Sequence, residues 1–261
     1  MPTSNGGVAW LGEYRFALSE LVLKDFRVRY RNMSLGIFWS LLNPLVMMGV
    51  LTFVFTQVYP STQSSFPVFV LCGLIPFNFF ALAWSSGTAS LLDNIALIKR
   101  VPVPREIVPV ASVLSHCLHL GIQIALLILF TLLYGFQINI YWMLLPLVWA
   151  LEVIFVIGMV MATSALNVYV RDTRYVVESV NLILFWLVPV FYSFEMIRPE
   201  HAGIYQLNPV AALVLAMRSI LMQGHAPPWT LLYKLTITSL TAFAVGLFIF
   251  RRLKHRFYDY L

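Results

Sequence analysis

The stretch KDFRVRYRNMSLGIFWSLLNP, residues 24–44, decides the fold class of this chain. It opens with four cations in close succession, Lys24, Arg27, Arg29 and Arg31. From Asn32 to Leu92 there follows not one Asp, Glu, Lys or Arg. A water-soluble domain cannot bury so long an uncharged apolar run, whereas a bilayer accommodates two spanning helices of about 20 residues each in it. The boundary between water and hydrocarbon is therefore expected near residue 32.

The composition indicates a membrane protein along the whole chain. The 261 residues are 60% hydrophobic and 11% charged, against a charged share of about 25% in soluble domains. We expect a single membrane domain over residues 1–261, without a cleaved signal peptide at the N-terminus. Cys72 and Cys117 both lie in apolar segments, so no disulfide is predicted. The net charge of +6 does not indicate nucleic-acid binding, because the cations lie at the predicted membrane boundaries.

Six apolar segments are long enough to span a bilayer, which predicts an all-α integral membrane protein with six transmembrane helices. They cover residues 35–59, 66–92, 107–134, 141–168, 175–194 and 229–250. Of the 17 cations, 14 lie before residue 32, in the loops 93–106 and 169–174, or after residue 250. The loops around 60–65 and 135–140 contain none. By the positive-inside rule, both termini are expected in the cytoplasm.

A helix over residues 11–31 is expected on the membrane surface rather than across it. At helical spacing, charged side chains fall on one side and apolar side chains on the other. The charged side holds Glu13, Glu20, Lys24, Arg27 and Arg31. The apolar side holds Leu11, Tyr14, Leu18, Leu21 and Val22. This pattern predicts an N-terminal amphipathic interfacial helix that leads into the first span.

The outer loop 195–228 contains a further helical pattern in LNPVAALVLAMRSILMQG, residues 207–224. Asn208 suits the N-cap, Pro209 the first helical position and Gly224 the residue after the end. The segment between is about 15 residues long, which is too short to span the membrane. We therefore expect short re-entrant or interfacial helices in this loop.

The loop 93–106 differs from an ordinary polar turn. It mixes apolar residues with Lys99 and Arg100, and prolines at 102, 104 and 109 stiffen its exit. A stiff, partly apolar loop is typical of a segment that docks into a groove of a cytoplasmic partner. The alternative is a plain re-entry loop that obeys the positive-inside rule.

Four motifs, in this order along the chain, resemble those of one family: the membrane subunits of bacterial type-2 ABC exporters for lipid-linked polysaccharides. These subunits export O-antigen, capsule or teichoic acid. RYRNMSLGIFWSLLNPLV (29–46) resembles the start of their span 1, and LIKRVPVPREIVP (97–109) their loop between spans 2 and 3. RDTRYVVESVNLILFWLVPVFYS (171–193) resembles the passage into span 5. Residues 207–224 resemble the outer-loop helix, in which an aromatic residue commonly precedes the Arg and this chain has Met217.

The resemblance implies a homodimer in the bacterial cytoplasmic membrane, with one ABC ATPase subunit docked under each protomer. This chain has no GxxxxGK[ST] motif, so we expect no ATPase activity or cofactor of its own; ATP and Mg²⁺ would bind to the partner. Residues 93–106 would form the coupling loop. Its expected coupling residues are Asn94, Ile98, Lys99, Arg100, Pro102, Arg105 and Glu106.

The first and fifth spans are rich in aromatic side chains, and the resemblance implies that they border the conduit. Sugars stack their C–H faces on aromatic rings and hydrogen-bond to amides, so a glycan conduit needs both. The expected lining residues are Trp39, Asn43, Phe53, Tyr59, Asn181, Phe185, Trp186 and Tyr192. An interfacial aromatic belt is the alternative for Tyr59 and Tyr192.

The cations Arg27, Arg29 and Arg31 are candidates for contact with the diphosphate of a lipid-linked substrate at the inner leaflet. The alternative is that they only set the topology. If these arginines contact the diphosphate, their replacement by alanine should lower export while the protein still inserts into the membrane.

Three further polar residues lie inside predicted spans. Glu152 is the only acidic one, and it suits either a proton path or a hydrogen-bonded contact between helices, of which the second is favoured because no relay partner follows. His116 and His119 have the spacing of two metal ligands, but inter-helix hydrogen bonding is favoured because no third ligand appears. The competing functions are thus a permease for a drug or small amphiphile, and an intramembrane enzyme that uses Glu152 or the two histidines.

Overall fold

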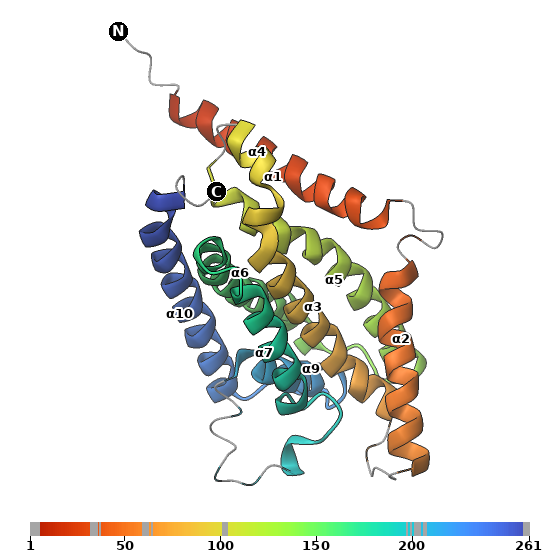
Figure 1. The fold of residues 1–261 in the computed structure, drawn as a ribbon. Helices are drawn as coiled ribbons and strands as arrows, with labels where there is room; N and C mark the ends of the chain where they lie inside the picture. Colours follow the sequence, from red (N-terminus) through yellow and green to blue (C-terminus); the bar gives the residue numbers. More distant parts are fainter. Residues whose placement is uncertain are drawn as a thin grey trace.

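The structure is a computed structural model that describes residues 6–31, 36, 38–58, 63, 65–100, 104–196, 198, 200, 205 and 208–257. Within these residues every regular element is a helix (Figure 1). The α-helices are α1 (Gly6–Tyr30), α2 (Phe38–Phe53), α3 (Phe66–Asp93), α4 (Ile95–Arg100), α5 (Ile107–Leu133), α6 (Leu145–Tyr169), α7 (Thr173–Leu187), α9 (Pro209–Leu221) and α10 (Trp229–Leu253). A π-helical turn (Val54–Val58) continues α2, and short 3₁₀ turns occupy Ile140–Leu144, Phe194–Met196 and Lys254–Arg256.

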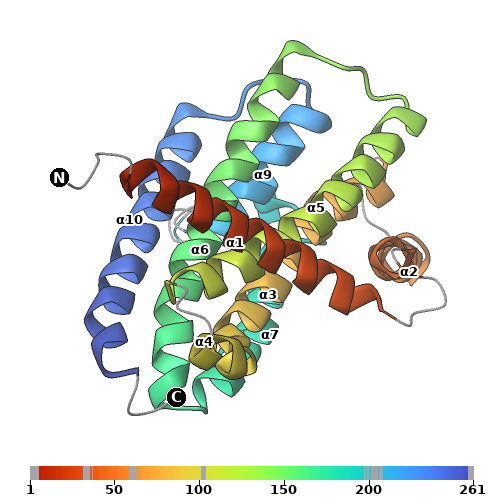
Figure 2. The same cartoon turned by 90° about the horizontal axis from the view of Figure 1, so that it is seen from above.

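The long helices run side by side, and α1 and α4 lie at one end of the bundle (Figure 1). Viewed onto that end, α1 crosses over the bundle from beside α10 toward α2 (Figure 2). We call this end, which carries α1, α4 and the end of α10, the basic end. Five of the described helical stretches are long and apolar enough to cross a membrane: Phe38–Val58, Phe66–Asp93, Ile107–Leu133, Ile140–Tyr169 and Trp229–Arg256. The predicted all-helical, multi-pass fold is confirmed, and these stretches match five of the six predicted spans.

The helix at the remaining predicted span, 175–194, is shorter than its apolar pattern indicates. α7 begins at Thr173 and ends at Leu187 after 15 residues. At 1.5 Å per residue it is about 22 Å long, less than the roughly 30 Å of a hydrocarbon core. The cause is Pro189, because a proline moves the residue before it out of the helical region. Val188 is accordingly extended, with φ −75° and ψ 135°.

The centre of the bundle is α3, of whose 28 residues 20 are buried. By contrast, Ser40 and Pro44 are the buried residues of α2. Pro44 lies inside α2 and lacks an N–H, so the Ser40 carbonyl one turn earlier has no donor from its own helix. Gln123 of α5 supplies one, with Nε2 at 3.1 Å from the Ser40 oxygen. A neighbouring helix thus replaces the hydrogen bond that Pro44 removes from α2, as is required of backbone groups inside a membrane.

α6 and α10 pack closely at a pair of glycines. A Cβ on Gly246 would lie 1.9 Å from the carbonyl oxygen of Gly158, and one on Gly158 would lie 2.5 Å from the backbone of Ala242. No side chain fits at either position without moving a backbone. Such small-residue contacts are typical of helices that approach closely in membranes.

The two elements expected at the membrane surface, α1 and α9, pack against the bundle. The predicted apolar side of α1 contributes Leu18, Leu21 and Val22 to a cluster with Ile107 and Ala111 of α5. α9 begins as predicted: the Asn208 side chain accepts a hydrogen bond from the Val210 N–H at 3.1 Å. However, 11 of its 13 residues are buried, so protein rather than lipid surrounds this helix.

Candidate functional site

The residues expected to line a conduit fall into an exposed and a buried group. Trp39, Asn43 and Phe53 of α2 are exposed, as is Trp186 near the end of α7. α3 lies between these two helices and contacts both. We call the exposed surface of α2 and α7 the aromatic face. The fractions exposed are large for such rings, 49% for Trp39 and 62% for both Phe53 and Trp186.

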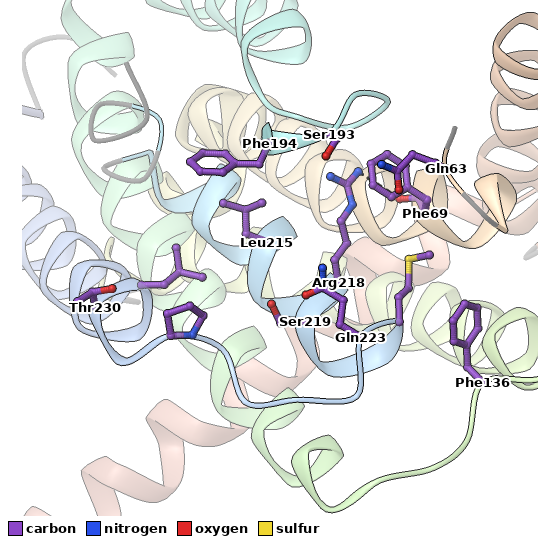
Figure 3. Close-up of a pocket in the computed structure, with 13 residues that line it drawn as sticks. Gln63, Phe69, Phe136, Ser193, Phe194, Leu215, Arg218, Ser219, Gln223 and Thr230 are labelled. Atoms are coloured by element: carbon purple, nitrogen blue, oxygen red, sulfur yellow. Dashed lines mark hydrogen bonds between the residues drawn. The ribbon is translucent and has the colours of Figure 1, made fainter. Parts of the chain in front are cut away.

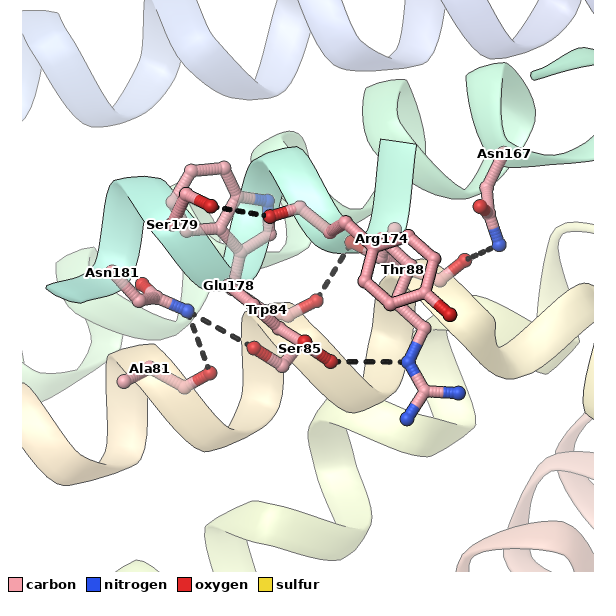
Figure 4. Close-up of polar contacts among 10 residues, drawn as sticks. Ala81, Trp84, Ser85, Thr88, Asn167, Arg174, Glu178, Ser179 and Asn181 are labelled. Carbon is pink, nitrogen blue, oxygen red and sulfur yellow. Dashed lines mark hydrogen bonds and ion pairs between the residues drawn. The ribbon is translucent and has the colours of Figure 1, made fainter. Parts of the chain in front are cut away.

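Asn181 belongs to the buried group and fastens α7 to α3 (Figure 4). Its Nδ2 donates to the Ala81 carbonyl at 3.3 Å and to the Ser85 hydroxyl at 3.0 Å. Its Oδ1 is buried without a hydrogen-bond partner among the described residues. One turn toward the basic end, Arg174 and Glu178 form an exposed ion pair along the same helix at 3.1 Å. Asn181 thus marks the side of α7 that meets α3, and its role in lining a conduit stays a prediction.

Tyr192 completes the C-terminal end of α7. Its hydroxyl donates to the Leu187 carbonyl at 2.8 Å and lies 3.3 Å from that of Trp186. These carbonyls belong to the last turn of α7, where the carbonyl groups receive no hydrogen bond from an N–H of the same helix. Tyr192 therefore supports the broken end of the helix, and its half-buried ring lies where the aromatic face meets the end opposite to α1.

A chain of aromatic ring contacts, some stacked and some edge-to-face or tilted, links α2 to the segment after α7. Phe55 lies 5.6 Å from Phe66 and 5.5 Å from Phe191, measured between ring centroids. Phe191 lies 6.0 Å from Phe185, which in turn lies 5.3 Å from Phe77 of α3. Phe185, one of the predicted lining residues, is therefore half-buried within this cluster. The contact between Phe55 and Phe191 holds the ends of α2 and α7 together.

A cavity of about 410 Å³ lies beside this cluster and contains a buried cation, Arg218 of α9 (Figure 3). The guanidinium donates from Nη2 to the carbonyls of Val190 at 2.7 Å and Phe69 at 3.2 Å. It also lies over the Phe69 ring, with Cζ 3.4 Å from the centroid. Among the described residues no carboxylate pairs with it. Arg218 thus satisfies the Val190 carbonyl, which the break at Pro189 leaves without a helical donor. In the sequence, this Arg stands out only as part of the outer-loop motif at residues 207–224.

At the basic end, the expected coupling loop contains the short helix α4. Lys99 and Arg100 are exposed in its last turn. Asn94 precedes it and joins three elements: its Nδ2 donates to the Ser90 carbonyl of α3 at 2.9 Å, and its Oδ1 accepts from Lys24 Nζ of α1 at 2.7 Å. Ile98 packs beside the cluster that contains Leu91 and Phe257. Pro102 lies outside the described residues, as does Tyr59 of the predicted lining set.

The end of the coupling loop is joined to the C-terminal end of α10. Glu106 pairs with Lys254 at 2.5 Å, and Arg105 donates to the Lys254 carbonyl at 2.9 Å. Burial raises the pKa of the Glu106 carboxyl, but the hydrogen bond from Lys254 and the nearby charges of Lys254 and Arg251 outweigh it, so that the pKa lies below its usual value. The loop therefore contacts α1 at its beginning and α10 at its end.

Of the three cations proposed to contact a diphosphate, only Arg29 lines a cavity between α1, α3 and α5. This cavity has a volume of about 380 Å³. Its polar lining residues are Lys24, Asp25, Arg29, Ser86, Ser90, Asp93, Asn94, Ser112 and Ser115. Arg27 and Arg31 are exposed and do not line it.

His116 forms the inter-helix hydrogen bonds favoured for it from the sequence. Its Nε2 lies 2.6 Å from Arg29 Nη2 and 3.2 Å from the Ser86 hydroxyl, while Nδ1 lies 2.8 Å from the Ser112 carbonyl. Because a carbonyl only accepts and a guanidinium only donates, the proton is assigned to Nδ1. Among the described residues, no group of three or more His, Cys, Asp and Glu could hold a metal ion.

Glu152 is buried in α6, with 1% of its surface exposed. Neither carboxyl oxygen has a hydrogen-bond partner among the described residues. This arrangement supports neither a relay nor the hydrogen-bonded contact between helices that the sequence favoured, and the role of this residue stays a prediction.

These features define an all-helical multi-pass membrane protein with an exposed aromatic face. Its basic end presents the short helix α4, and the residues on either side of α4 are bonded to α1 and to the end of α10. The chain belongs to the ABC-2 type transporter family, whose model matches residues 17–222. The resemblance predicted from the four motifs is confirmed.

Named relatives extend the match over nearly the whole chain. The O-antigen export system permease protein RfbA of Klebsiella pneumoniae is 32% identical over 243 residues, which cover 91% of this chain and 92% of the relative. A protein of the same name from Myxococcus xanthus is 27% identical over 219 residues, with 83% and 84% covered. The polysialic acid transport protein KpsM of Escherichia coli is 23% identical over 242 residues, with 91% and 93% covered.

Proposed function

We propose that this chain is the permease subunit of an ATP-driven exporter that moves a lipid-linked polysaccharide across the bacterial cytoplasmic membrane. It works as a homodimer with a separate ATPase subunit, which binds ATP and Mg²⁺, and its basic end and both termini face the cytoplasm. The observation that carries the proposal is the alignment with relatives named as O-antigen and polysialic acid exporters, which covers 91% of this chain. No step of covalent chemistry on the substrate is assigned to this chain.

The basic end suits contact with an ATPase. α4 presents Lys99 and Arg100 to solvent, while Asn94 and Glu106 on either side are bonded to α1 and α10. A partner that docks on α4 therefore moves α1 with it. Nucleotide drives the cycle because it binds the closed ATPase dimer more tightly than the open one. Only such a difference in affinity can shift the equilibrium between the open and closed conformations.

The aromatic face suits a glycan. Trp39, Phe53 and Trp186 offer exposed rings to the C–H faces of sugars, and Asn43 offers an amide to their hydroxyls. In the proposed homodimer this face borders the conduit, and α2 and α7 part to admit the chain from the inner leaflet. α2 is suited to such movement because so little of it is buried.

The cavity beside Arg29 suits the diphosphate that links lipid and glycan. Arg29 and Lys24 provide charged donors within one cavity at the basic end, which Asp25 and Asp93 also line; Asp25 pairs with Lys24 at 3.3 Å. Charge-assisted hydrogen bonds of this kind are the strong ones. Arg29 is therefore the preferred contact among the three arginines, ahead of Arg27 and Arg31.

The test is transport of a lipid-linked glycan by proteoliposomes that contain this chain and its co-expressed ATPase. We expect Trp39→Ala and Trp186→Ala to lower transport several-fold at equal protein levels. Trp229→Ala is the matched control, because Trp229 is an 85% exposed tryptophan on α10, outside the aromatic face. Transport of small amphiphiles without glycolipid would instead establish the drug-permease alternative, and catalytic activity of the isolated chain would establish an intramembrane enzyme.

A further inference from the structure

A second cavity at the basic end lies away from the aromatic face. It has a volume of about 730 Å³, within the usual range of small-molecule sites. Its inner wall is apolar and comes from three spanning helices: Val110 of α5, Ile157 and Met161 of α6, and Phe243 and Leu247 of α10. Figure 2 shows α10 and α6 on the opposite side of the bundle from α2, with α1 crossing above them. We call this cavity the α6–α10 notch.

The rim of the notch is cationic. Arg105, Arg251, Lys254 and His255 line it together with Tyr14 and a single carboxylate, Glu106. Three permanent cations therefore face one anion, which leaves the rim positive even with His255 neutral. The wall below the rim carries no charge.

The rim and wall are aligned on one face of one helix. Phe243, Leu247 and Arg251 follow at intervals of four residues, so their side chains lie one above another on α10. From Phe243 to Arg251 the helix rises about 12 Å. The notch therefore changes from apolar to cationic along the direction of the helix axis, the direction in which a phospholipid changes from acyl chain to phosphate.

The protein holds the rim in place by contacts of its own. Arg105 donates to the Lys254 carbonyl at 2.9 Å and lies 5.8 Å from the centroid of the Phe257 ring. Lys254 pairs with Glu106, and the close packing of Gly158 on Gly246 fixes the wall. Arg251 is exposed, as are Arg252 and Arg256 on the same terminal segment, but of these three arginines it alone lines the notch. Arg105 and Lys254 are thus held by contacts beyond what membrane topology alone requires.

We propose that the α6–α10 notch binds one anionic phospholipid, with its headgroup phosphate among Arg251, Lys254 and Arg105 and an acyl chain along the wall. An anionic headgroup is preferred to a zwitterionic one because the rim has a surplus of positive charge. Each cation near a membrane surface contributes about a fivefold gain in affinity for anionic lipid. The site is separate from the proposed conduit, and it does not depend on which substrate is exported.

The test is lipid binding to the full-length protein, measured by native mass spectrometry during titration with phosphatidylglycerol or phosphatidylcholine. We expect one tightly held phosphatidylglycerol, and a loss of affinity of about fivefold for Arg251→Ala. Arg252→Ala is the matched control, since it removes the same charge from the neighbouring position, and it should leave this lipid bound. Val110→Phe fills the wall with the rim intact, and it should release the lipid as well.

Three results would overturn the proposal. Equal losses for Arg251→Ala and Arg252→Ala would show diffuse attraction to a basic surface. Equal retention of phosphatidylcholine would remove the preference for an anionic headgroup. Displacement of the lipid by inorganic phosphate at millimolar concentration, together with unchanged binding in Val110→Phe, would show an anion site that makes no use of the apolar wall.

Discussion

The hydrogen bond from Gln123 to the Ser40 carbonyl predicts a specific coupling between α5 and the proline of α2. Gln123→Met retains the length of the side chain and removes the donor, so the Ser40 carbonyl loses the hydrogen bond from α5. Hydrogen bonds between membrane helices contribute about 0.6 kcal/mol on average and up to about 1.7 kcal/mol, while an unsatisfied buried group costs about 1–3 kcal/mol. Ser40 is only 4% exposed, so we expect a loss near 1 kcal/mol. For a chain of this size this lowers the Tm by about 2–4 °C.

A double-mutant cycle with Pro44→Ala tests this coupling. Alanine restores the N–H that donates to Ser40 from within α2, so Gln123 has nothing left to satisfy. We expect Gln123→Met to lower the Tm in the wild-type background and to leave it unchanged in the Pro44→Ala background. The measurement is thermal unfolding of the four proteins in one detergent, with Gln137→Met in an exposed loop as control. An equal fall in Tm in both backgrounds would refute the account, because the loss would then be independent of the broken helical bond.

Three further outcomes are expected. The pKa of Glu106 lies below its usual value, so its pairing with Lys254 adds stability above the usual glutamate pKa of about 4.3 and loses it as pH falls through the lowered value; the Tm difference between wild type and Glu106→Gln should therefore be present at pH 6–7 and vanish in stronger acid. Arg218→Lys should lower the Tm by about 4–8 °C, since one ammonium cannot reproduce the planar contacts of the guanidinium and each hydrogen bond from a charged donor contributes about 1.5–3 kcal/mol. Gly246→Ala should destabilise by about 1–3 kcal/mol or more, whereas Gly49→Ala, with no atom within 4 Å of the added Cβ, should be neutral or stabilising in the same unfolding assay.

Much of the fold could be predicted from the sequence, because the membrane makes length and charge decisive. The 61 uncharged residues after Arg31 and the placement of the cations predict the long helices within a few residues of where the structure has them. The shorter helix at α7 has a local cause. Residues 188–194 are mostly apolar, so the sequence extends the predicted span to residue 194, whereas Pro189 ends the helix at Leu187. A proline inside an apolar run is a helix-stop signal, and it accounts for the end of this helix.

The candidate site could be predicted only in part, since the direction of a side chain depends on which helices are neighbours. The sequence identifies aromatic residues on α2 and α7, yet nothing in it separates exposed Trp186 from half-buried Phe185. The contact of Asn181 with α3 could not be predicted, because nothing in the sequence indicates that Ala81 and Ser85 lie opposite it. Buried Arg218 gave one usable signal, a lone cation in an apolar helix, which marks a functional or structural contact in membrane proteins.

The early end of α7 also has a consequence for the electric field at the end opposite to α1. A helix carries about half a negative charge at its C-terminus, and here that terminus ends short of a full span. Arg218 places a positive charge against the carbonyls of Val190 and Tyr192, directly beyond the last turn. The dipole and the cation oppose each other, so the field there is weaker than that of the cation alone. In the proposed conduit, a neutral sugar that leaves along the aromatic face would meet exposed rings beside this partly compensated charge, so stacking rather than charge is expected to determine which chains pass.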